Sequence, residues 1–219
     1  RSSDLLVSLI SGISVSTSIR TPSRPTTVAE MTLETIILTS LWLIVPLGIL
    51  GSLLHFLFDW TGHNKFVALI AAVNESYWEH IKIAFWPVLL VQLGLFAAGG
   101  FQFSSFIPAA TIALYSIPIA MTGLVFLYKA VSKRNVLWID ITIFFLVIAI
   151  AQVIFVLLVQ ELDPSINTSL LSLAFLVGLV VAFLRFTAQP PREPDVFVDP
   201  TNKRYGLRAH PDVDSSVGD

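Results

Sequence analysis

The sequence predicts an all-α fold, a polytopic membrane bundle of about five transmembrane helices with a cytoplasmic C-terminus. Three observations predict it. Of 219 residues, 55% are hydrophobic and only 13% are charged, whereas a soluble domain carries about 25% charged residues. The mean hydropathy is +0.80. Long apolar runs recur along the chain, each near the roughly 20 residues that span a hydrocarbon core about 30 Å thick.

The apolar runs place the helices. A helix satisfies its own backbone hydrogen bonds, so it is the open structure that can cross lipid. The expected helices cover residues 35–60, 76–98, 106–128, 136–159 and 168–186. A shorter apolar stretch, residues 66–73, cannot span a bilayer, and we expect it to lie at the interface or to re-enter between the first two helices.

These runs divide the chain into three parts. Residues 1–34 are rich in Ser, Thr and Arg and are expected to be an extension outside the core, with a signal sequence or a sixth span as the alternative. Residues 35–188 form the transmembrane domain. Residues 189–219 form a polar tail, in which a turn-like stretch at 199–202 predicts a small hairpin. The end of the tail, from about His210, is expected to be disordered.

Charge sets the orientation and excludes several functions. If the loop between the third and fourth helices is cytoplasmic, ten of the 13 Lys and Arg residues lie inside, and the other three precede Met31. This asymmetry predicts a cytoplasmic C-terminus. A net charge of −2 without a basic tract argues against nucleic acid as a partner. The absence of cysteine excludes disulfides and thiolate metal sites.

Ionisable residues gather at one level of the expected bundle. Alternate helices enter and leave at the same face, and the charged or titratable groups in or beside the spans lie at those ends: His55, Asp59, Glu75, Glu79, His80, Lys82, Asp140 and Arg185. A charge at the bilayer centre costs at least about 2–3 kcal/mol, so such groups face a bundle interior or a wet cavity.

Imidazole and carboxylate groups are the ligands that zinc and similar divalent ions prefer. His55 and Asp59 have i,i+4 spacing and continue a stripe of small residues on the first helix. His63 is one further step along, after Gly62. The candidate ligands of a divalent metal such as zinc are therefore His55, Asp59, Glu79 and His80, and Glu75 is the candidate general base acting on bound water.

Each of these residues also has a structural interpretation. Asn74 is a good N-cap, and Ser76 with Glu79 has capping-box spacing. Glu79 and Lys82, at i,i+3, suit a plain ion pair. Asp140 suits a buried ion pair with Lys82 or Arg185. The small residues of the first helix suit a packing groove between helices.

The sequence also resembles a known family. Residues 53–60 (LLHFLFDW), 73–82 (VNESYWEHIK) and the tail stretch 199–206 (DPTNKRYG) are similar to a family of small prokaryotic membrane proteins of unknown function. The Asn-Glu-Ser-x-Trp-Glu-His-x-Lys string is its distinctive part. The resemblance covers residues 35–207, implies the prokaryotic cytoplasmic membrane as the location, and implies a fold and a site without a reaction.

Three functions are consistent with these features. The first, which the sequence favours over the two alternatives that follow, is an accessory or structural subunit of a membrane complex, with other membrane subunits as partners. The second is an intramembrane metal-dependent hydrolase that uses the His, Asp and Glu cluster on a lipid-like substrate. The third is binding or transport of a cation or proton through the acidic groups.

Overall fold

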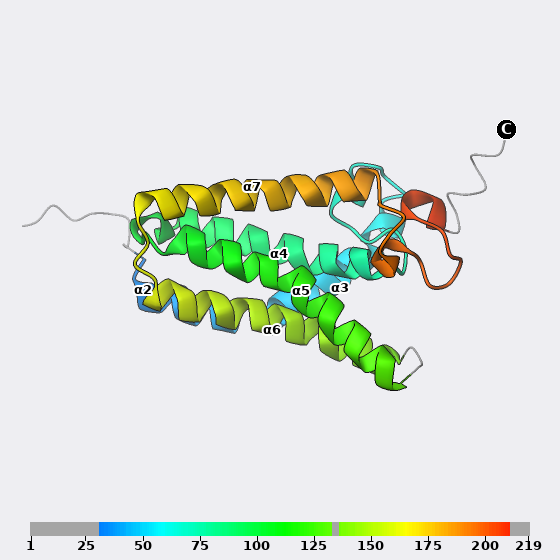
Figure 1. Ribbon diagram of the computed structural model, residues 1–219, viewed down its shortest axis with the longest axis horizontal. Helices are drawn as coiled ribbons and strands as arrows, with labels where there is room; N and C mark the ends of the chain where they lie inside the picture. Colours follow the sequence, from blue (N-terminus) through cyan, green and yellow to red (C-terminus); the bar gives the residue numbers. More distant parts are fainter. Residues whose placement is uncertain (1–30, 133–135, 211–219) are drawn as a thin grey trace, which may run out of the picture.

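A computed structural model describes residues 31–132 and 136–210, and in this part of the chain the fold is all-α, as predicted, with six α-helices. The extension at 1–30 and the tail end beyond His210 lie outside the described residues. The helices are α2 (Leu33–Trp42), α3 (Ile44–Trp60), α4 (Tyr77–Ala97), α5 (Phe106–Ser132), α6 (Leu137–Glu161) and α7 (Ile166–Ala188) (Figure 1). Four of them are long and apolar enough to cross a membrane, or five spans if α2 and α3 count as one.

The first predicted helix is broken rather than continuous. α2 and α3 meet at Leu43 with a bend of 49°. Pro46 follows three residues later, and it explains the break because its ring has no N–H to donate to the carbonyl of Trp42 and clashes with that carbonyl. Because of the bend, the axis of α2 points in a different direction from the axis of α3. Both helices still contact α6 (Figure 1).

The helices alternate in direction, so two segments meet at one end of the bundle. The connecting loop, residues 61–76, joins α3 to α4, and the C-terminal segment, residues 189–210, follows α7. Figure 1 shows both segments gathered at the end opposite to the start of α7. We call this the polar end. The connections from α4 to α5 and from α6 to α7 lie at the other end.

Aromatic stacking and small residues hold the helices together. The rings of Phe85 on α4 and Phe183 on α7 stack with centroids 3.9 Å apart. Gly48 and Gly51 lie buried on α3, where a Cβ atom would overlap the rings of Phe145 and Phe144 on α6. The predicted groove for helix packing therefore exists. Much of α7 is exposed, as expected for a helix that faces lipid.

A polar contact also crosses the middle of the bundle. Gln92 Nε2 on α4 donates to Gln152 Oε1 on α6 at 3.3 Å, and Gln152 Nε2 donates to the backbone carbonyl of Ser40 on α2 at 2.9 Å. All three residues are buried. Hydrogen bonds of this kind tie transmembrane helices together.

Candidate functional site

The connecting loop is fastened to α4 by a buried ion pair. Lys82 Nζ lies 2.5 Å from Glu79 Oε2 and donates to the carbonyl of Ala68 at 2.7 Å. The same Glu79 oxygen accepts from the N–H of Val73 at 3.0 Å. Glu79 thus serves the loop rather than a capping box, and Ser76 takes the N-cap position of α4 without a side-chain cap. The loop is held close to the start of α4.

His55, Glu75 and His80 lie together beside this loop. His55 Nε2 on α3 lies 3.3 Å from Glu75 Oε1, and the rings of His55 and His80 are 5.4 Å apart between centroids. His80 Nδ1 donates to the carbonyl of Ser76 at 2.9 Å, because a carbonyl oxygen only accepts. This bond leaves Nε2 of a neutral His80 with its lone pair.

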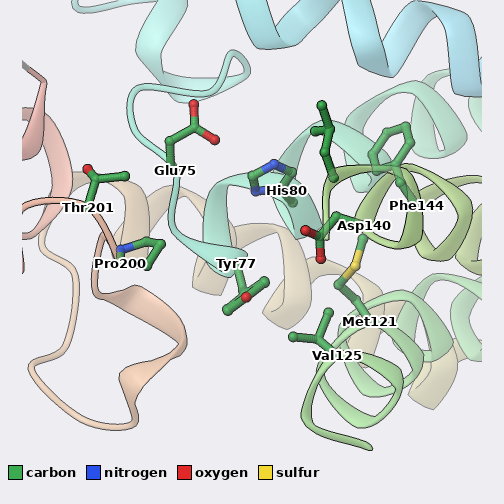
Figure 2. Close-up of a pocket in the computed structure, with 10 residues that line it drawn as sticks. Glu75, Tyr77, His80, Met121, Val125, Asp140, Phe144, Pro200 and Thr201 are labelled. Atoms are coloured by element: carbon green, nitrogen blue, oxygen red, sulfur yellow. The ribbon is translucent and has the colours of Figure 1, made fainter. Parts of the chain in front are cut away.

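Asp140, at the start of α6, faces the same place. Tyr128 on α5 donates its hydroxyl to Asp140 Oδ1 at 2.7 Å. In Figure 2 Asp140 lies beside His80, with Glu75 on the preceding loop. Thr201 of the C-terminal segment borders the same pocket. The pocket is therefore built from elements that are far apart in the sequence.

A second cavity, of about 330 Å³, extends from this group between α3 and α6. Its polar lining comes from His55, Glu75, His80, Asp140 and Ser52, and the rest of its lining is apolar: Phe56, Ile83, Leu137, Ile141 and Phe144. A third cavity, of about 490 Å³, lies between the end of α3, the connecting loop and the C-terminal segment. Glu75 lines all three cavities. Glu75 thus borders each of them.

The C-terminal segment folds back onto the connecting loop. Asn74 Nδ2 donates to the carbonyl of Gly206 at 3.0 Å, and the N–H of Glu75 donates to Asp199 Oδ2 at 3.3 Å. Asp199 is buried, and its other oxygen accepts from the N–H of Thr201 at 2.7 Å. An isolated antiparallel bridge pairs Val198 with Tyr205 around this turn. The segment closes the polar end of the bundle.

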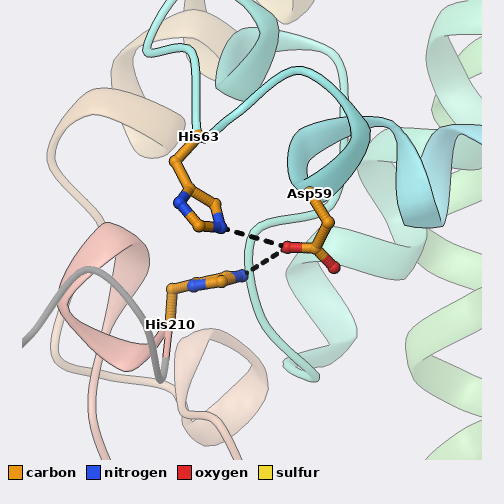
Figure 3. A group of neighbouring side chains, drawn as sticks. All are labelled: Asp59, His63 and His210. Atoms are coloured by element: carbon orange, nitrogen blue, oxygen red, sulfur yellow. Dashed lines mark hydrogen bonds and ion pairs between the residues drawn. The ribbon is translucent and has the colours of Figure 1, made fainter.

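Asp59 belongs to a separate cluster at the end of α3. Its Oδ1 lies 2.8 Å from His210 Nε2 and 3.4 Å from His63 Nε2. Figure 3 shows both imidazoles directed at this one oxygen. The two rings are 4.6 Å apart between centroids. Asp59 and His210 line the same 490 Å³ cavity as His55 and Glu75.

Electrostatics favour an ionised Glu75. The hydrogen bond with His55 holds the pKa of Glu75 below its usual value, desolvation opposes it, and His55 and His80 lower the pKa further when they are protonated. The carboxylate is about half exposed. The Glu75 carboxylate is therefore ionised across the pH range of most cells, and it can accept a hydrogen bond from an imidazole N–H.

The residues singled out from the sequence separate into three groups, with Arg185 outside them. His55, Glu75, His80 and Asp140 share one cavity, and Asp59 lies apart with His63 and His210. Glu79 and Lys82 form the ion pair behind the loop, while Asn74 holds the C-terminal segment. Arg185 is exposed near the end of α7.

Sequence reasoning did not find His210, Asp199 and Tyr128. Two of these residues have partners that are distant in sequence: His210 lies 151 residues from Asp59, and Asp199 lies 124 residues from Glu75. His63 had a signal, its i+4 spacing from Asp59, although α3 ends before it. No local pattern indicated the other three.

Comparison with known proteins identifies one family. No curated protein and no solved structure matches the chain. Residues 31–207 match a family described as "Family of unknown function (DUF6512)". The match takes in the described helices, the connecting loop and most of the C-terminal segment, and His210 lies just beyond it. The chain therefore belongs to this family of unknown function, DUF6512.

Proposed function

We propose that this protein is a membrane-embedded hydrolase that cleaves an amphiphilic ester or phosphoester at the polar end of the bundle. The observation that carries the proposal is the cavity between α3 and α6. It joins His55, Glu75, His80 and Asp140 to an apolar wall. A substrate with a polar head and an apolar chain matches such a lining, because each part meets groups of its own kind.

His55 and Glu75 supply a general base in this proposal. An ionised Glu75 accepts the Nε2–H of His55, which leaves the lone pair of His55 on Nδ1. That nitrogen takes a proton from water while the water oxygen bonds to the carbonyl carbon or phosphorus. The bond to the leaving oxygen breaks, and His55 returns the proton to it. His80 Nε2 is a second acceptor within the same cavity.

Two observations favour hydrolysis over the alternatives. For transport, a polar path would have to continue toward the other end, yet Gln92 and Gln152 bond to each other in the middle of the described core. For an accessory subunit, an ion pair such as that of Glu79 and Lys82 would be enough. An accessory subunit would not require two imidazoles beside an open cavity. We assign the divalent ion expected from the sequence to the neighbouring cluster of Asp59, as argued below.

The proposed setting follows the positive-inside rule. The Lys and Arg distribution supports a C-terminal segment on the cytoplasmic side, and the resemblance supports a prokaryotic cytoplasmic membrane. The catalytic pocket would then open toward the cytoplasmic leaflet. Its substrate would be a lipid or lipid-linked molecule of that leaflet.

The test uses the full chain in nanodiscs with p-nitrophenyl palmitate and bis-p-nitrophenyl phosphate as probes. We expect hydrolysis of one probe by the wild type and a loss of about 100-fold or more in His55→Gln and Glu75→Gln, because general bases contribute roughly 10²–10⁴. Glu161→Gln, at the opposite end of α6, is the matched control and should keep the wild-type rate. Hydrolysis of neither probe, or equal rates in Glu75→Gln and wild type, would contradict the proposal.

A further inference from the structure

We infer that Asp59, His63 and His210 form a divalent metal site, suited to zinc, which joins the C-terminal segment to the end of α3. The inference does not rest on the proposed hydrolysis. It rests on ligand geometry, on the way the chain presents each ligand, and on the place of the cluster beside a cavity.

The spacing of the three ligand atoms fits one ion. In a tetrahedral zinc site with bonds of about 2.0–2.1 Å, neighbouring ligand atoms are about 3.3 Å apart. Here Asp59 Oδ1 lies 3.4 Å from His63 Nε2 and 2.8 Å from His210 Nε2, and all three ligand atoms lie within 4.8 Å of one another. Small side-chain adjustments would give each atom its bond to a central ion.

The chain turns sharply to present His63. The end of α3 is followed by Gly62 and His63 in the left-handed region, with φ of 65° and 63°. A non-glycine residue adopts this conformation at a cost, and such strain concentrates at functional sites. The N–H of His63 bonds to the carbonyl of Phe58 at 3.0 Å. The turn therefore folds the imidazole back beside Asp59, one helical turn earlier.

His210, from the C-terminal segment, is held in place by several contacts. Only 7% of its surface is exposed. Its N–H donates to the carbonyl of Leu207 at 3.2 Å, and the side chain of Asn202 donates to the preceding carbonyl, that of Ala209, at 2.6 Å. The ring of Phe58, itself buried, contacts both imidazoles with centroids 5.2 Å away. These contacts preorganise the site.

The ligand chemistry selects the ion. Two imidazole nitrogens and one carboxylate suit zinc better than calcium or magnesium, which prefer oxygen. With three protein ligands, the remaining coordination position is left for water or substrate, as in catalytic zinc sites. Asp59 and His210 line the 490 Å³ cavity that also holds His55 and Glu75. An ion at this site would therefore face the same space as the proposed general base.

The experiment measures metal binding by the untagged full chain in detergent after treatment with a chelator. Zn²⁺ is titrated by calorimetry, and Co²⁺ is followed by its visible spectrum. We expect one ion per chain, bound at least about tenfold more weakly by His210→Ala and by His63→Asn. Asparagine is chosen because it tolerates the left-handed backbone. His80→Ala, in the neighbouring pocket, should bind like the wild type.

A second readout reports the docking of the C-terminal segment. Trypsin cleaves after Lys203, Arg204 and Arg208, and we expect Zn²⁺ to slow this cleavage several-fold in the wild type but not in His210→Ala. Equal Zn²⁺ affinity in wild type, His63→Asn and His210→Ala would overturn the inference, as would binding without protection from trypsin. If the wild type binds Zn²⁺ but hydrolyses neither probe, that result contradicts only the proposed function.

Discussion

The ammonium of Lys82 lies 2.5 Å from the carboxylate of Glu79, and both side chains are closed off from solvent, with 0% and 3% exposed. Their remaining hydrogen bonds go to the backbone of the connecting loop, at Ala68 and Val73. The pairing thus offsets the cost of burying two charges. The hydrogen bonds from the pair to the loop backbone hold the loop in place and so position Glu75 and Asn74. The polar end depends on this fastening, although neither charge lines a described cavity.

Removing one member of this pair should be strongly destabilising. Lys82→Met leaves Glu79 as an unpaired buried charge, which costs about 3–5 kcal/mol. The double variant Glu79→Leu with Lys82→Met should cost less than the sum of the single changes, because no lone charge remains. Reversible unfolding in mixed micelles measures both. Lys129→Met, which removes the contact with the ring of Tyr77 and an electrostatic attraction to Asp140, is the control and should cost about 1 kcal/mol or less. Equal losses for Lys82→Met and Lys129→Met would refute this role.

Two helix glycines should respond in opposite directions to alanine. A Cβ at Gly51 would lie 2.8 Å from the carbonyl oxygen of Ile83 and 2.6 Å from the ring of Phe144, so Gly51→Ala must push α3 away from its neighbours. We expect a loss of about 1–3 kcal/mol. At Gly178 nothing lies within 4 Å, so alanine should add about 0.5–1 kcal/mol through helix propensity. Thermal unfolding compares the two variants, and a shift of the same sign in both would count against the close packing of α3.

The contact between Asn74 and Gly206 should control the docking of the C-terminal segment. Asn74→Ala removes the hydrogen bond to the Gly206 carbonyl, and a bond of this type contributes about 0.5–1.5 kcal/mol. Tryptic cleavage after Arg204 should become roughly 2- to 10-fold faster, in line with that energy. Asn167→Ala, exposed at the start of α7, is the matched control. If both variants are cleaved at the wild-type rate, the segment is held by other contacts.

The link between His55 and Glu75 should weaken in acid. Because its pKa is depressed in the folded state, Glu75 contributes stability that is fully present above the unfolded value of about 4.3. This contribution is lost as the pH falls through the lower folded pKa. The difference in unfolding free energy between wild type and Glu75→Gln should therefore be constant from about pH 5 to 6 and shrink below about pH 4. In a His55→Gln background the pH dependence should largely vanish, and its persistence there would exclude His55 as the cause.

The helices were predictable because each span carries its own signal. Length and hydropathy place residues 76–98, 106–128, 136–159 and 168–186 within a few residues of α4, α5, α6 and α7. The break between α2 and α3 was less visible, since Pro46 sits inside an uninterrupted apolar run. Its effect depends on a missing backbone donor rather than on hydrophobicity.

The site was predictable only in part, for a physical reason. Helix direction brings His55, Glu75, His80 and Asp140 to one level, and the alternation of spans predicts this. The partner of each group depends on the loop and the C-terminal segment, whose paths follow from long-range contacts such as that of Glu75 with Asp199. Helix periodicity does not encode such contacts, so the division between the two histidine clusters was not foreseen.

The central claim is that Glu75, Asp140 and the C-terminal segment share one face of a five-crossing bundle. The chain has no cysteine, so single cysteines can report it directly. Leu137→Cys, Thr201→Cys and Asp163→Cys are reacted with a membrane-impermeant maleimide in inside-out and right-side-out vesicles. We predict that positions 137 and 201 label from the same side and position 163 from the opposite side. Labelling of 137 and 201 from opposite sides would contradict the account.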